Sequence, residues 1–398
     1  MAKVRKRQWK SGGETREAWV ADYFDQHGKR HIKTFDRKRD ADAWLIGTQH
    51  DVSQGTHTAD RASITVAEAA DLWTEAARQK GRERSTVKQY EEHVAHHISP
   101  LIGSEKLSRL TTPRCEKFKD DLLATRTPAL TRKILVSLKS LLSEAQRRGL
   151  VVQNAAKPVK IEIRSRSKRK IDAGSGFPTK AEVTAMIKVA AGRWRPLLVA
   201  AVFTGLRSSE LRGLRWDDVD LSAKVLHVRQ RADQWGEIGV PKSEAGDREV
   251  PLSPMVVAAL KEWKLKCPRR DKSKDDPGKL DLVFPNGVGK VESHANIVTR
   301  GLGPVQVTAG VAVPVLDKDG QAILDDDGNP LMAAKYGMHA FRHFFASWII
   351  EQGFSPKKVQ ALLGHSSIQM TYDVYGHLFP NLEDDHARFA AGELAIVG

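Results

Sequence analysis

The first 60 residues alternate apolar and polar positions in a way that predicts a small sheet followed by a helix. Glu17–Phe24 is rich in strand formers, and Arg30–Phe35 alternates polar and apolar residues as a returning strand does. A turn at residues 25–28 would join these two strands, and residues 4–10 would add a third. Residues 36–50 then predict a helix with its apolar side chains on one face, namely Ala41, Trp44 and Leu45.

Residues 63–156 have helical periodicity throughout. Ser63 or Thr65 would cap a first helix, and Ser85 would open a second. Thr112-Pro113 and Thr127-Pro128 are each typical of an N-cap followed by proline at the first helical position, and the last helix would end at Gly149. Four helices with short connections predict a compact bundle.

A basic segment, residues 157–170, follows this bundle, with seven Lys or Arg and one Glu. Runs of this kind are usually solvated connectors. Between two DNA-binding domains the same run could also follow the phosphate backbone, which gives affinity without sequence reading. The sequence leaves both interpretations open.

The remaining chain predicts a mostly helical domain with one hairpin. A capping box at Thr179–Glu182 starts its first helix, which runs to residue 190. Further helices are predicted at 193–203, 254–266 and 338–351, and a hairpin at 224–231 and 239–251. The segment 305–336 contains two Asp-rich turns ending in glycine. They predict hairpin turns and not calcium loops, because the calcium-loop register places Val315 or Ile323 at the first ligand position.

The amino-acid composition indicates which class of molecule the protein binds. The 398 residues contain 64 Lys and Arg against 49 Asp and Glu, a formal net charge of +15. Such an excess favours a polyanionic partner, either nucleic acid or an acidic membrane surface. No apolar run is long enough to cross a bilayer, and no signal peptide begins at Met1. The two cysteines, Cys115 and Cys267, have no metal-type spacing, so we expect a cytoplasmic protein without disulfides or zinc.

Basic residues in the first segment are interleaved with aromatic ones, among them Trp9 and Trp19. A DNA-binding sheet has this composition, and so does a solvated sheet face around a small aromatic core. The segment alone does not separate these two interpretations.

Five side chains suited to phosphate chemistry occur in the last domain. Arg207 follows a Gly turn, His339 and Arg342 stand three apart on one helical face, His365 follows Gly364, and Tyr375 precedes Gly-His. Each alone has an ordinary explanation, such as a surface arginine or a tyrosine packed in the core. Their order along the chain is what carries information.

In this order, and with their flanking residues, these side chains resemble the tyrosine recombinase (phage integrase) family. The matching segments are TGLRSSELRGLRW at Thr204–Trp216, HAFRHFFASW at His339–Trp348 and LLGHSSIQMTYDVYGHLFP at Leu362–Pro380. VPKSEAGDREVPL at Val240–Leu252 is similar to the family's hairpin with its catalytic lysine, here Lys242. The resemblance covers the whole last domain. The helical domain resembles the core-binding domain, and the first segment more loosely resembles an arm-type DNA-binding domain.

The resemblance implies two arginines that neutralise the phosphate. Transfer of a phosphodiester to a tyrosine oxygen passes through a five-coordinate phosphorus with extra negative charge. Arg207 and Arg342 would stabilise that charge, and His365 would donate a hydrogen bond to the phosphate. No metal, ATP or other cofactor is implied, and the sequence contains no Walker-type loop.

The remaining implied roles concern proton transfer. A free tyrosine has a pKa of about 10, so Tyr375 needs help to become a nucleophile. By the resemblance His339 assists its deprotonation, and Lys242 protonates the leaving 5′ oxygen. Glu210 either orients its neighbours or is an ordinary helix acid, and His343 is given a structural role only.

Two other tyrosines compete for the role of nucleophile. Tyr372 lies one turn before Tyr375, and Tyr336 precedes the His-x-x-Arg motif. The family's nucleophile stands directly before a small residue and His, which favours Tyr375. The long insert at 305–336 departs from the family pattern and leaves the loop geometry before His339 open.

The expected fold class is therefore multidomain α+β. It comprises an arm-type DNA-binding domain at 1–60 with a three-stranded sheet and a helix, and a helical core-binding (SAM-like) bundle at 61–156. A basic linker at 157–176 leads to a mostly α catalytic domain at 177–398 with a small antiparallel sheet. The expected partners are double-stranded DNA at core and arm sites, three further copies of the chain, and accessory DNA-bending or directionality proteins. The tail from residue 381 would pack on a neighbouring subunit or on its own domain.

The expected activity is site-specific recombination that integrates a mobile element, through a covalent 3′-phosphotyrosyl intermediate. Two other hypotheses compete with this one, a DNA-binding regulator on the same scaffold and an enzyme of a different class. A silent DNA-binding regulator predicts a damaged catalytic set, whereas every position here is filled. A type IB topoisomerase shares the tyrosine chemistry but requires no arm-like second DNA-binding segment.

Overall fold

The computed structural model describes residues 2–12, 14–25, 28–55, 57, 60, 63–162, 172–268, 281–379 and 385–397. Its contacts divide the chain into two compact units, Met1–Arg166 and Ser167–Gly398. Residues 163–171 of the predicted basic linker lie outside the described residues, as do residues 26–27 of the first predicted turn and residues 381–384 of the tail.

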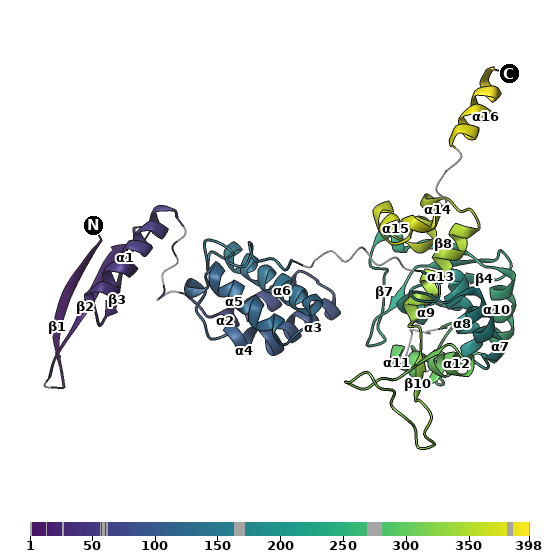
Figure 1. Cartoon of the computed structure of the whole chain (residues 1–398), viewed down its shortest axis with the longest axis horizontal. Coiled ribbons are helices and arrows are strands. Elements are labelled where there is room, and N and C mark those ends of the chain that lie inside the picture. The colour runs from purple at the N-terminus through teal and green to yellow at the C-terminus, as the bar shows by residue number, and fades with distance from the viewer. Residues whose placement is uncertain are drawn as a thin grey trace, which may run out of the picture. The chain divides into compact units, whose positions relative to one another are not determined.

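The first unit begins with an antiparallel sheet of order β1-β2-β3, with β1 at Lys3–Ser11, β2 at Glu14–Phe24 and β3 at Arg30–Phe35 (Figure 1). Helix α1, Lys38–Ser53, packs on it through a small core that includes Ala21, Tyr23 and Leu45. The three predicted strands are confirmed. The predicted helix is confirmed with shifted ends, because it begins two residues later and ends three residues later than expected.

A helical bundle completes the first unit. Its elements are α2 Val66–Gln79, α3 Arg84–His93, η1 Val94–Ile98, α4 Ser99–Ile102, η2 Leu107–Arg109, α5 Thr112–Leu123 and α6 Pro128–Arg147. Thr65 forms the capping box of α2, Thr127 caps α6, and Gly149 follows α6 with a φ of 71°. These predicted boundaries are confirmed. Helix caps depend on a few neighbouring residues, so the local sequence is enough to predict them.

Two predicted caps in the bundle are wrong by one or two residues. The cap of α5 is Thr111 and not Thr112, because the Thr111 hydroxyl accepts the hydrogen bond from the Arg114 amide. Helix α3 begins at Arg84, so Ser85 lies within its first turn, and the N-cap position, Glu83, makes no side-chain capping bond.

The second unit is mostly helical, as predicted. Its elements are α7 Lys180–Val189, α8 Trp194–Thr204, α9 Ser208–Gly213, η3 Trp216–Asp218, β4 Val219–Asp220, β5 Val225–Val228, β6 Arg231–Ala232, β7 Ile238–Gly239, η4 Glu244–Gly246, β8 Arg248–Pro251, α10 Pro254–Lys266, α11 His294–Asn296, η5 Ile297–Leu302, α12 Gly303–Thr308, β9 Ala312–Pro314, β10 Met332–Ala334, α13 Met338–Glu351, α14 Pro356–Leu363, α15 Ile368–Tyr375 and η6 Gly376–Leu378. The predicted helices 254–266 and 338–351 are confirmed at both ends. The tail contains a further helix, α16, at Asp385–Val397.

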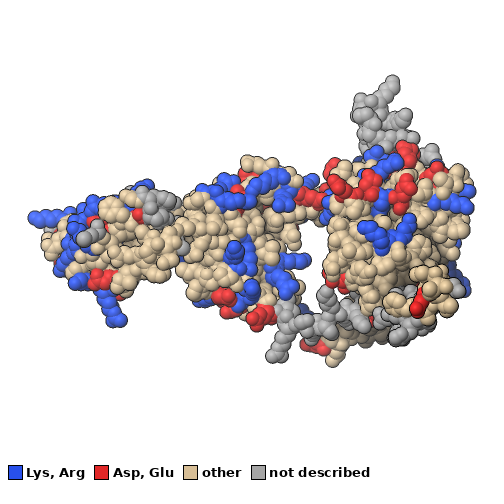
Figure 2. All heavy atoms as spheres, turned by 90° about the horizontal axis from the view of Figure 1, so that it is seen from above, with Lys and Arg blue, Asp and Glu red and all other residues tan. Residues whose placement is uncertain are grey.

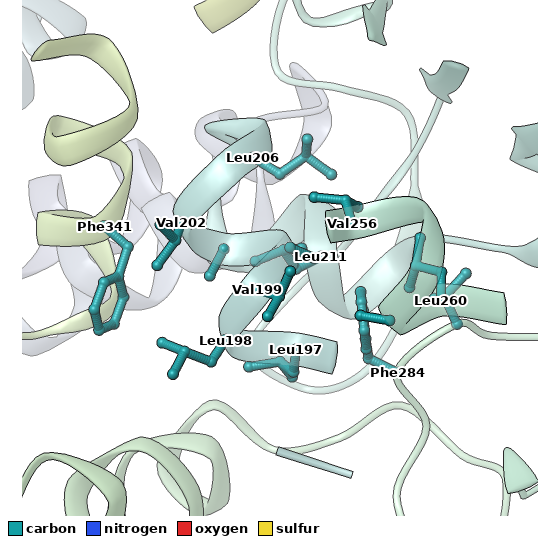
Figure 3. Packing of buried hydrophobic residues seen from close by; sticks show 14 of the residues in the cluster. Leu197, Leu198, Val199, Val202, Leu206, Leu211, Val256, Leu260, Phe284 and Phe341 are labelled. Carbon is teal, nitrogen blue, oxygen red and sulfur yellow. The ribbon is translucent and has the colours of Figure 1, made fainter. Parts of the chain in front are cut away.

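Helix α8 is the centre of the second unit. Its residues from Pro196 to Val202 are buried without interruption, as expected for a helix surrounded by other elements. Figure 3 shows Leu197, Leu198 and Val202 among side chains of neighbouring elements, including Phe341 of α13 and Leu260 of α10. Because α8 packs against other elements on all its faces, its C-terminal end is rigidly placed. This end in turn positions the residues that follow it in the chain.

The predicted hairpin exists but is divided into two ladders. Strand β5 pairs with β8, with Leu226 opposite Val250, and β4 extends this sheet in the order β4-β5-β8. The tip of the hairpin forms a separate pair, β6 with β7.

The insert at 305–336 forms the two hairpin turns that its sequence predicts. Bridges join Leu316 to Ala322 and Leu324 to Pro330, and the short β9–β10 pair forms the base. Every residue from 316 to 332 is exposed, so the two turns add no core to the unit, whereas Val311 and Tyr336 at the ends of the insert are buried in its core. Among the residues that the structure describes, no helix is long and apolar enough to cross a membrane.

Candidate active site

The C-terminal end of α8 positions the first arginine of the predicted set. Gly205 ends the helix in the left-handed conformation, with a φ of 64°. A side chain at this position would overlap the ring of Phe345 on α13, so glycine is required by both the backbone and the packing. The chain then turns sharply, and Arg207 stands at the start of α9.

A second left-handed glycine ends α14 at the opposite side of the site. Gly364 has a φ of 62°, and a Cβ there would lie 2.7 Å from the carbonyl oxygen of Ala245. This close approach brings the loop before β8 against the α14 end. His365 follows directly and is 8% exposed.

Arg342 joins these two helix ends. It lies on α13 with only 2% of its surface exposed, and it donates hydrogen bonds to the carbonyl oxygens of Gly205, at 2.6 Å, and Leu363. Carbonyls at a helix C-terminus carry partial negative charge and favour a cation. Burial lowers the pKa of Arg342 to about 9, with the charge of Arg207 adding to the effect, so the guanidinium keeps its charge at neutral pH.

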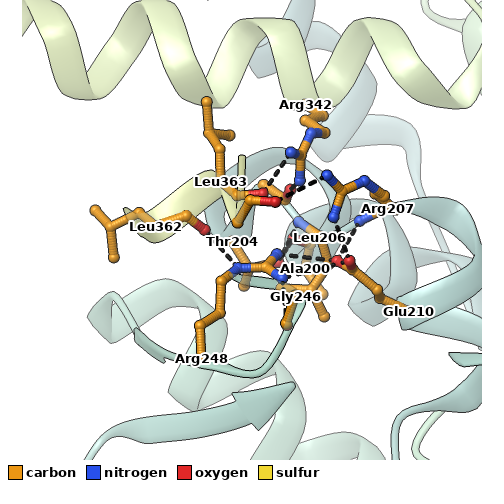
Figure 4. A network of polar contacts seen from close by, with 12 residues as sticks. Ala200, Thr204, Leu206, Arg207, Glu210, Gly246, Arg248, Arg342, Leu362 and Leu363 are labelled. Atoms are coloured by element: carbon orange, nitrogen blue, oxygen red, sulfur yellow. Dashed lines mark hydrogen bonds and ion pairs between the residues drawn. The ribbon is translucent and has the colours of Figure 1, made fainter. Parts of the chain in front are cut away.

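Arg207 and Glu210 form the centre of a polar network (Figure 4). The Glu210 carboxylate accepts from the Arg207 backbone amide at 2.8 Å, from the Arg207 guanidinium at 2.7 Å and from Arg248 at 2.9 Å. Arg207 also donates to the carbonyl oxygen of Gly364 at 3.1 Å, and about a third of its side chain stays exposed. Burial alone would raise the pKa of Glu210, but Arg248 and Arg207 outweigh it and lower the pKa to about 2. Glu210 therefore holds both arginines in place as a permanent anion.

His365 is positioned through its Nδ1 atom. That nitrogen lies 3.0 Å from the hydroxyl of Thr371, which is fully buried on α15. Burial lowers the pKa of His365 to about 4, followed by the charges of Arg342 and Arg207, so the ring is neutral at physiological pH. Since Nδ1 is bound to Thr371, Nε2 is the nitrogen left for a ligand.

Tyr375 is buried at the C-terminal end of α15, with 1% of its surface exposed. Its ring is parallel to the His365 ring, with the centroids 6.4 Å apart. Its hydroxyl lies 2.7 Å from Nδ1 of His343. Burial raises the pKa of Tyr375 to about 12, against the opposing charge of Arg342, so the phenol is protonated at rest.

The competing tyrosines are placed differently. Tyr372 is 48% exposed and packs its ring against Phe379. Tyr336 is buried, and its hydroxyl donates to Glu182 at 3.0 Å. Of these three tyrosines, Tyr375 is the one whose ring stacks on His365.

His339 and Lys242 lie toward the outside of the site. His339 is exposed on one side, yet partial desolvation lowers its pKa, followed by the charges of Arg342 and Arg207. Its ring packs edge-on against His343, with the centroids 4.6 Å apart. Lys242 is exposed in the loop between β7 and β8, and this loop reaches the site through Ala245.

Sequence reasoning did not select two residues that the structure brings to the site. Arg248 bonds Glu210 and also donates to the carbonyl oxygen of Leu362 at 2.7 Å, a contact across more than a hundred residues that no local pattern can reveal. His343 was expected to be structural only, but it contacts the Tyr375 hydroxyl. One signal was available for it, because a residue four after His339 lies on the same helical face.

Together these residues place two guanidinium groups and a neutral imidazole near a phenol, an arrangement that could bind an oxyanion. The three groups are held by hydrogen bonds to the backbone or to a buried side chain. Donors fixed in advance in this way stabilise a transition state without reorganisation.

Two family models match parts of this chain. Residues 177–381 match the model of the phage integrase family, and residues 65–123 match that of the phage integrase N-terminal SAM-like domain. The chain is 27% identical to a tyrosine recombinase XerC-like protein of Caldanaerobacter subterraneus subsp. tengcongensis, over 93% of this chain and 94% of that protein.

Two solved structures share the fold. The Tn1549 transposon integrase in complex with a circular intermediate DNA matches with a TM-score of 0.60 at 20% identity, covering 83% of this chain and 100% of that one. A lambda integrase tetramer bound to a Holliday junction matches with a TM-score of 0.54 at 17% identity, covering 87% of this chain and 93% of that one. Because the family model matches just over half of the 398 residues, the chain belongs to the phage integrase family and is a tyrosine recombinase, an enzyme that breaks and rejoins DNA strands.

Proposed function

We propose that Tyr375 is the nucleophile of this recombinase and that Arg207, Arg342 and His365 bind the scissile phosphate. The observation that carries the proposal is the convergence of these side chains from three separate segments. Arg207 and Arg342 are tied to the ends of α8 and α14, while His365 stacks against Tyr375. The phenol oxygen of Tyr375 would attack the phosphorus atom of a phosphodiester that contacts both guanidinium groups.

The reaction conserves the energy of the phosphodiester bond. Tyr375 attacks phosphorus and forms a 3′-phosphotyrosyl bond, while the 5′ oxygen leaves. Lys242, exposed in its loop, is the proposed donor of the proton to that oxygen. A 5′ hydroxyl from the partner strand then reverses the attack and rejoins the DNA. His339 is expected, by the family resemblance, to assist the deprotonation of Tyr375.

The other domains supply DNA binding in this proposal. Residues 1–60 would bind arm sites, residues 61–156 would bind the core site opposite the catalytic domain at 177–398, and residues 157–176 would link them. In Figure 2 Lys and Arg side chains lie over the part built from β1–β3 and α1 and over the helical bundle. On β1 the exposed basic residues are Lys3, Arg5, Lys6, Arg7 and Lys10. Surfaces of this kind bind duplex DNA through its phosphates.

Recombination of two duplexes requires four strand cleavages, and so four nucleophiles. We therefore propose a homotetramer assembled on double-stranded DNA; a lambda integrase has been crystallised as a tetramer bound to a Holliday junction. Helix α16 exposes Phe389, Leu394 and Ile396, which supports packing of the tail on a neighbouring subunit. The proposed biological role is integration of a mobile element in the bacterial cell, with accessory DNA-bending or directionality proteins.

The first test is capture of the covalent intermediate. A library of nicked duplexes with random core sequence would be incubated with the full-length chain, without metal or ATP. DNA that stays on the protein in a denaturing gel would be recovered and sequenced. We expect a covalent band for the wild type and for Tyr372→Phe, and none for Tyr375→Phe.

Each other outcome has a distinct meaning. A band that survives in Tyr375→Phe and disappears in Tyr372→Phe would move the nucleophile to Tyr372. No band from the wild type, together with tight binding of the same DNA, would support the silent regulator and contradict the proposal.

A further inference from the structure

The Tyr375 hydroxyl makes a close polar contact with a residue that has no assigned catalytic role. His343 lies on α13, four residues after His339, and its Nδ1 atom is 2.7 Å from the Tyr375 oxygen. The described residues contain no hydrogen bond between His339 and Tyr375. The contact of His339 is with His343, whose ring it meets edge-on. His343 thus stands between His339 and the phenol.

The protonation states of the pair fix the direction of this hydrogen bond. Burial lowers the pKa of the His343 imidazole to about 4, followed by the charges of His339 and Arg342, so the ring is neutral. The phenol keeps its proton because burial raises its pKa to about 12. The hydroxyl of Tyr375 therefore donates to Nδ1 of His343, and the proton of the ring is on Nε2.

We propose that His343 is a further catalytic residue, the group that accepts the proton of Tyr375 as its oxygen attacks phosphorus. The inference rests on the proposed role of Tyr375 as nucleophile. The O–H bond breaks and its proton moves to Nδ1, while an oxygen electron pair forms the P–O bond. The P–O5′ bond breaks in the same displacement, and the 5′ oxygen takes its proton from Lys242. The proton returns from Nδ1 to the phenol oxygen when the strand is rejoined.

The resting site opposes this transfer, and bound DNA would favour it. In the DNA-free structure burial disfavours both the phenolate and the imidazolium. A phosphodiester on Arg207 and Arg342 brings a negative charge close to His343. A nearby opposite charge favours the protonated form of an imidazole. Proton transfer would then occur only with substrate in place, which keeps the nucleophile inert at other times.

The test separates nucleophile activation from leaving-group protonation. Single-turnover formation of the covalent complex would be measured on the nicked DNA recovered with the wild type. His343→Asn places an amide oxygen close to where Nδ1 lies, so it keeps a hydrogen-bond acceptor but removes the base. We expect the cleavage rate to fall about 10²-fold or more, in the range of general-base contributions. DNA affinity and the thermal midpoint should stay at the wild-type values.

Chemical rescue supplies the control. Replacing Tyr375 by a fluorinated tyrosine lowers the pKa of the phenol and should restore much of the rate to His343→Asn. A 5′-bridging phosphorothiolate, whose sulfur leaves without protonation, should not restore it. Lys242→Ala should show the reverse pattern, with rescue by the phosphorothiolate and none by the fluorinated tyrosine.

Three results would overturn the inference. The first is a His343→Asn rate within threefold of the wild type. The second is a loss that the fluorinated tyrosine does not restore, which would make His343 structural. The third is rescue of His339→Asn alone, which would assign the proton to His339. A wild type that forms no covalent complex would overturn the proposed function and this inference together, whereas the three results above leave Tyr375 as the nucleophile.

Discussion

Glu210→Gln removes a buried negative charge, and the structure allows the resulting loss in the free energy of unfolding to be calculated. The carboxylate is 3% exposed and accepts hydrogen bonds from Arg207 and Arg248. Glutamine keeps the shape but removes the charge, which leaves two buried or half-buried guanidiniums without their anion. Breaking one side of a buried ion pair costs about 3–5 kcal/mol.

The pKa of Glu210 gives a second estimate of the same quantity. The fall from an ordinary 4.5 to about 2 corresponds to about 3 kcal/mol of folding free energy at neutral pH. Because the folded-state pKa is the lower one, this stability is fully present above pH 4.5. It is lost as the pH falls from there toward 2. The two estimates agree, so we expect a loss of about 3 kcal/mol at pH 7 that shrinks below pH 4.5.

The assay is amide hydrogen exchange over a urea series, in the full-length chain, with peptides from residues 194–213 followed by mass spectrometry. These peptides contain α8 and α9, so they report on the second unit alone. Glu262→Gln is the matched control, because Glu262 forms an exposed pair with Lys266 at 3.6 Å and should change stability by less than about 0.5 kcal/mol. A loss below 1 kcal/mol for Glu210→Gln, or one that does not change between pH 7 and pH 3.5, would refute the reasoning.

Three further predictions concern single side chains. Arg342→Lys keeps the charge but cannot bond both helix ends, so we expect covalent-complex formation to fall about 10²–10³-fold in single turnover, and a fall under tenfold would contradict this. Gly205→Ala should lower the free energy of unfolding by at least about 1–2 kcal/mol, from its positive φ and its overlap with Phe345, whereas Gly47→Ala, in open space, should not lower the thermal midpoint. Cys115 is fully buried, and burial raises the pKa of its thiol to about 12. In a Cys267→Ser background a thiol reagent should therefore label Cys115 only as urea unfolds the bundle. Fast labelling in native buffer would count against the packing described.

The elements that the sequence predicted well are those specified by neighbouring residues. Strand Arg30–Phe35 and helix Met338–Glu351 have the predicted bounds, because alternation and helical period are local. One error arose where two adjacent residues compete for one role. Thr111 and Thr112 are chemically equal as caps, and only the extended backbone of Thr111, with φ −94° and ψ 163°, decides between them. The division of the hairpin into two ladders likewise depends on packing that periodicity does not record.

The same distinction between local sequence and tertiary packing applies to the candidate site. Arg207, Arg342, His365 and Tyr375 were selected from the order of the motifs, and the fold brings them into one polar centre. The residues that hold or contact them could not be selected in this way. The contact of Arg248 with Glu210 depends on how β8 approaches α9. That of His343 with Tyr375 depends on the crossing of α13 and α15.

The hydrogen bonds of the two arginines explain why glycines accompany them. A guanidinium that must meet a phosphate in a fixed position needs other partners for the donors that the phosphate does not use. Here those partners are the carbonyls of Gly205, Leu363 and Gly364, which a helix exposes only where it ends. Each helix ends at a glycine in the left-handed conformation, which lets the chain turn away at once and leaves these carbonyls open. The buried Arg342 is thus fixed by both helix ends, and the partly exposed Arg207 by the end of α14. Substitution of either glycine should therefore impair phosphate binding even where the unit still folds.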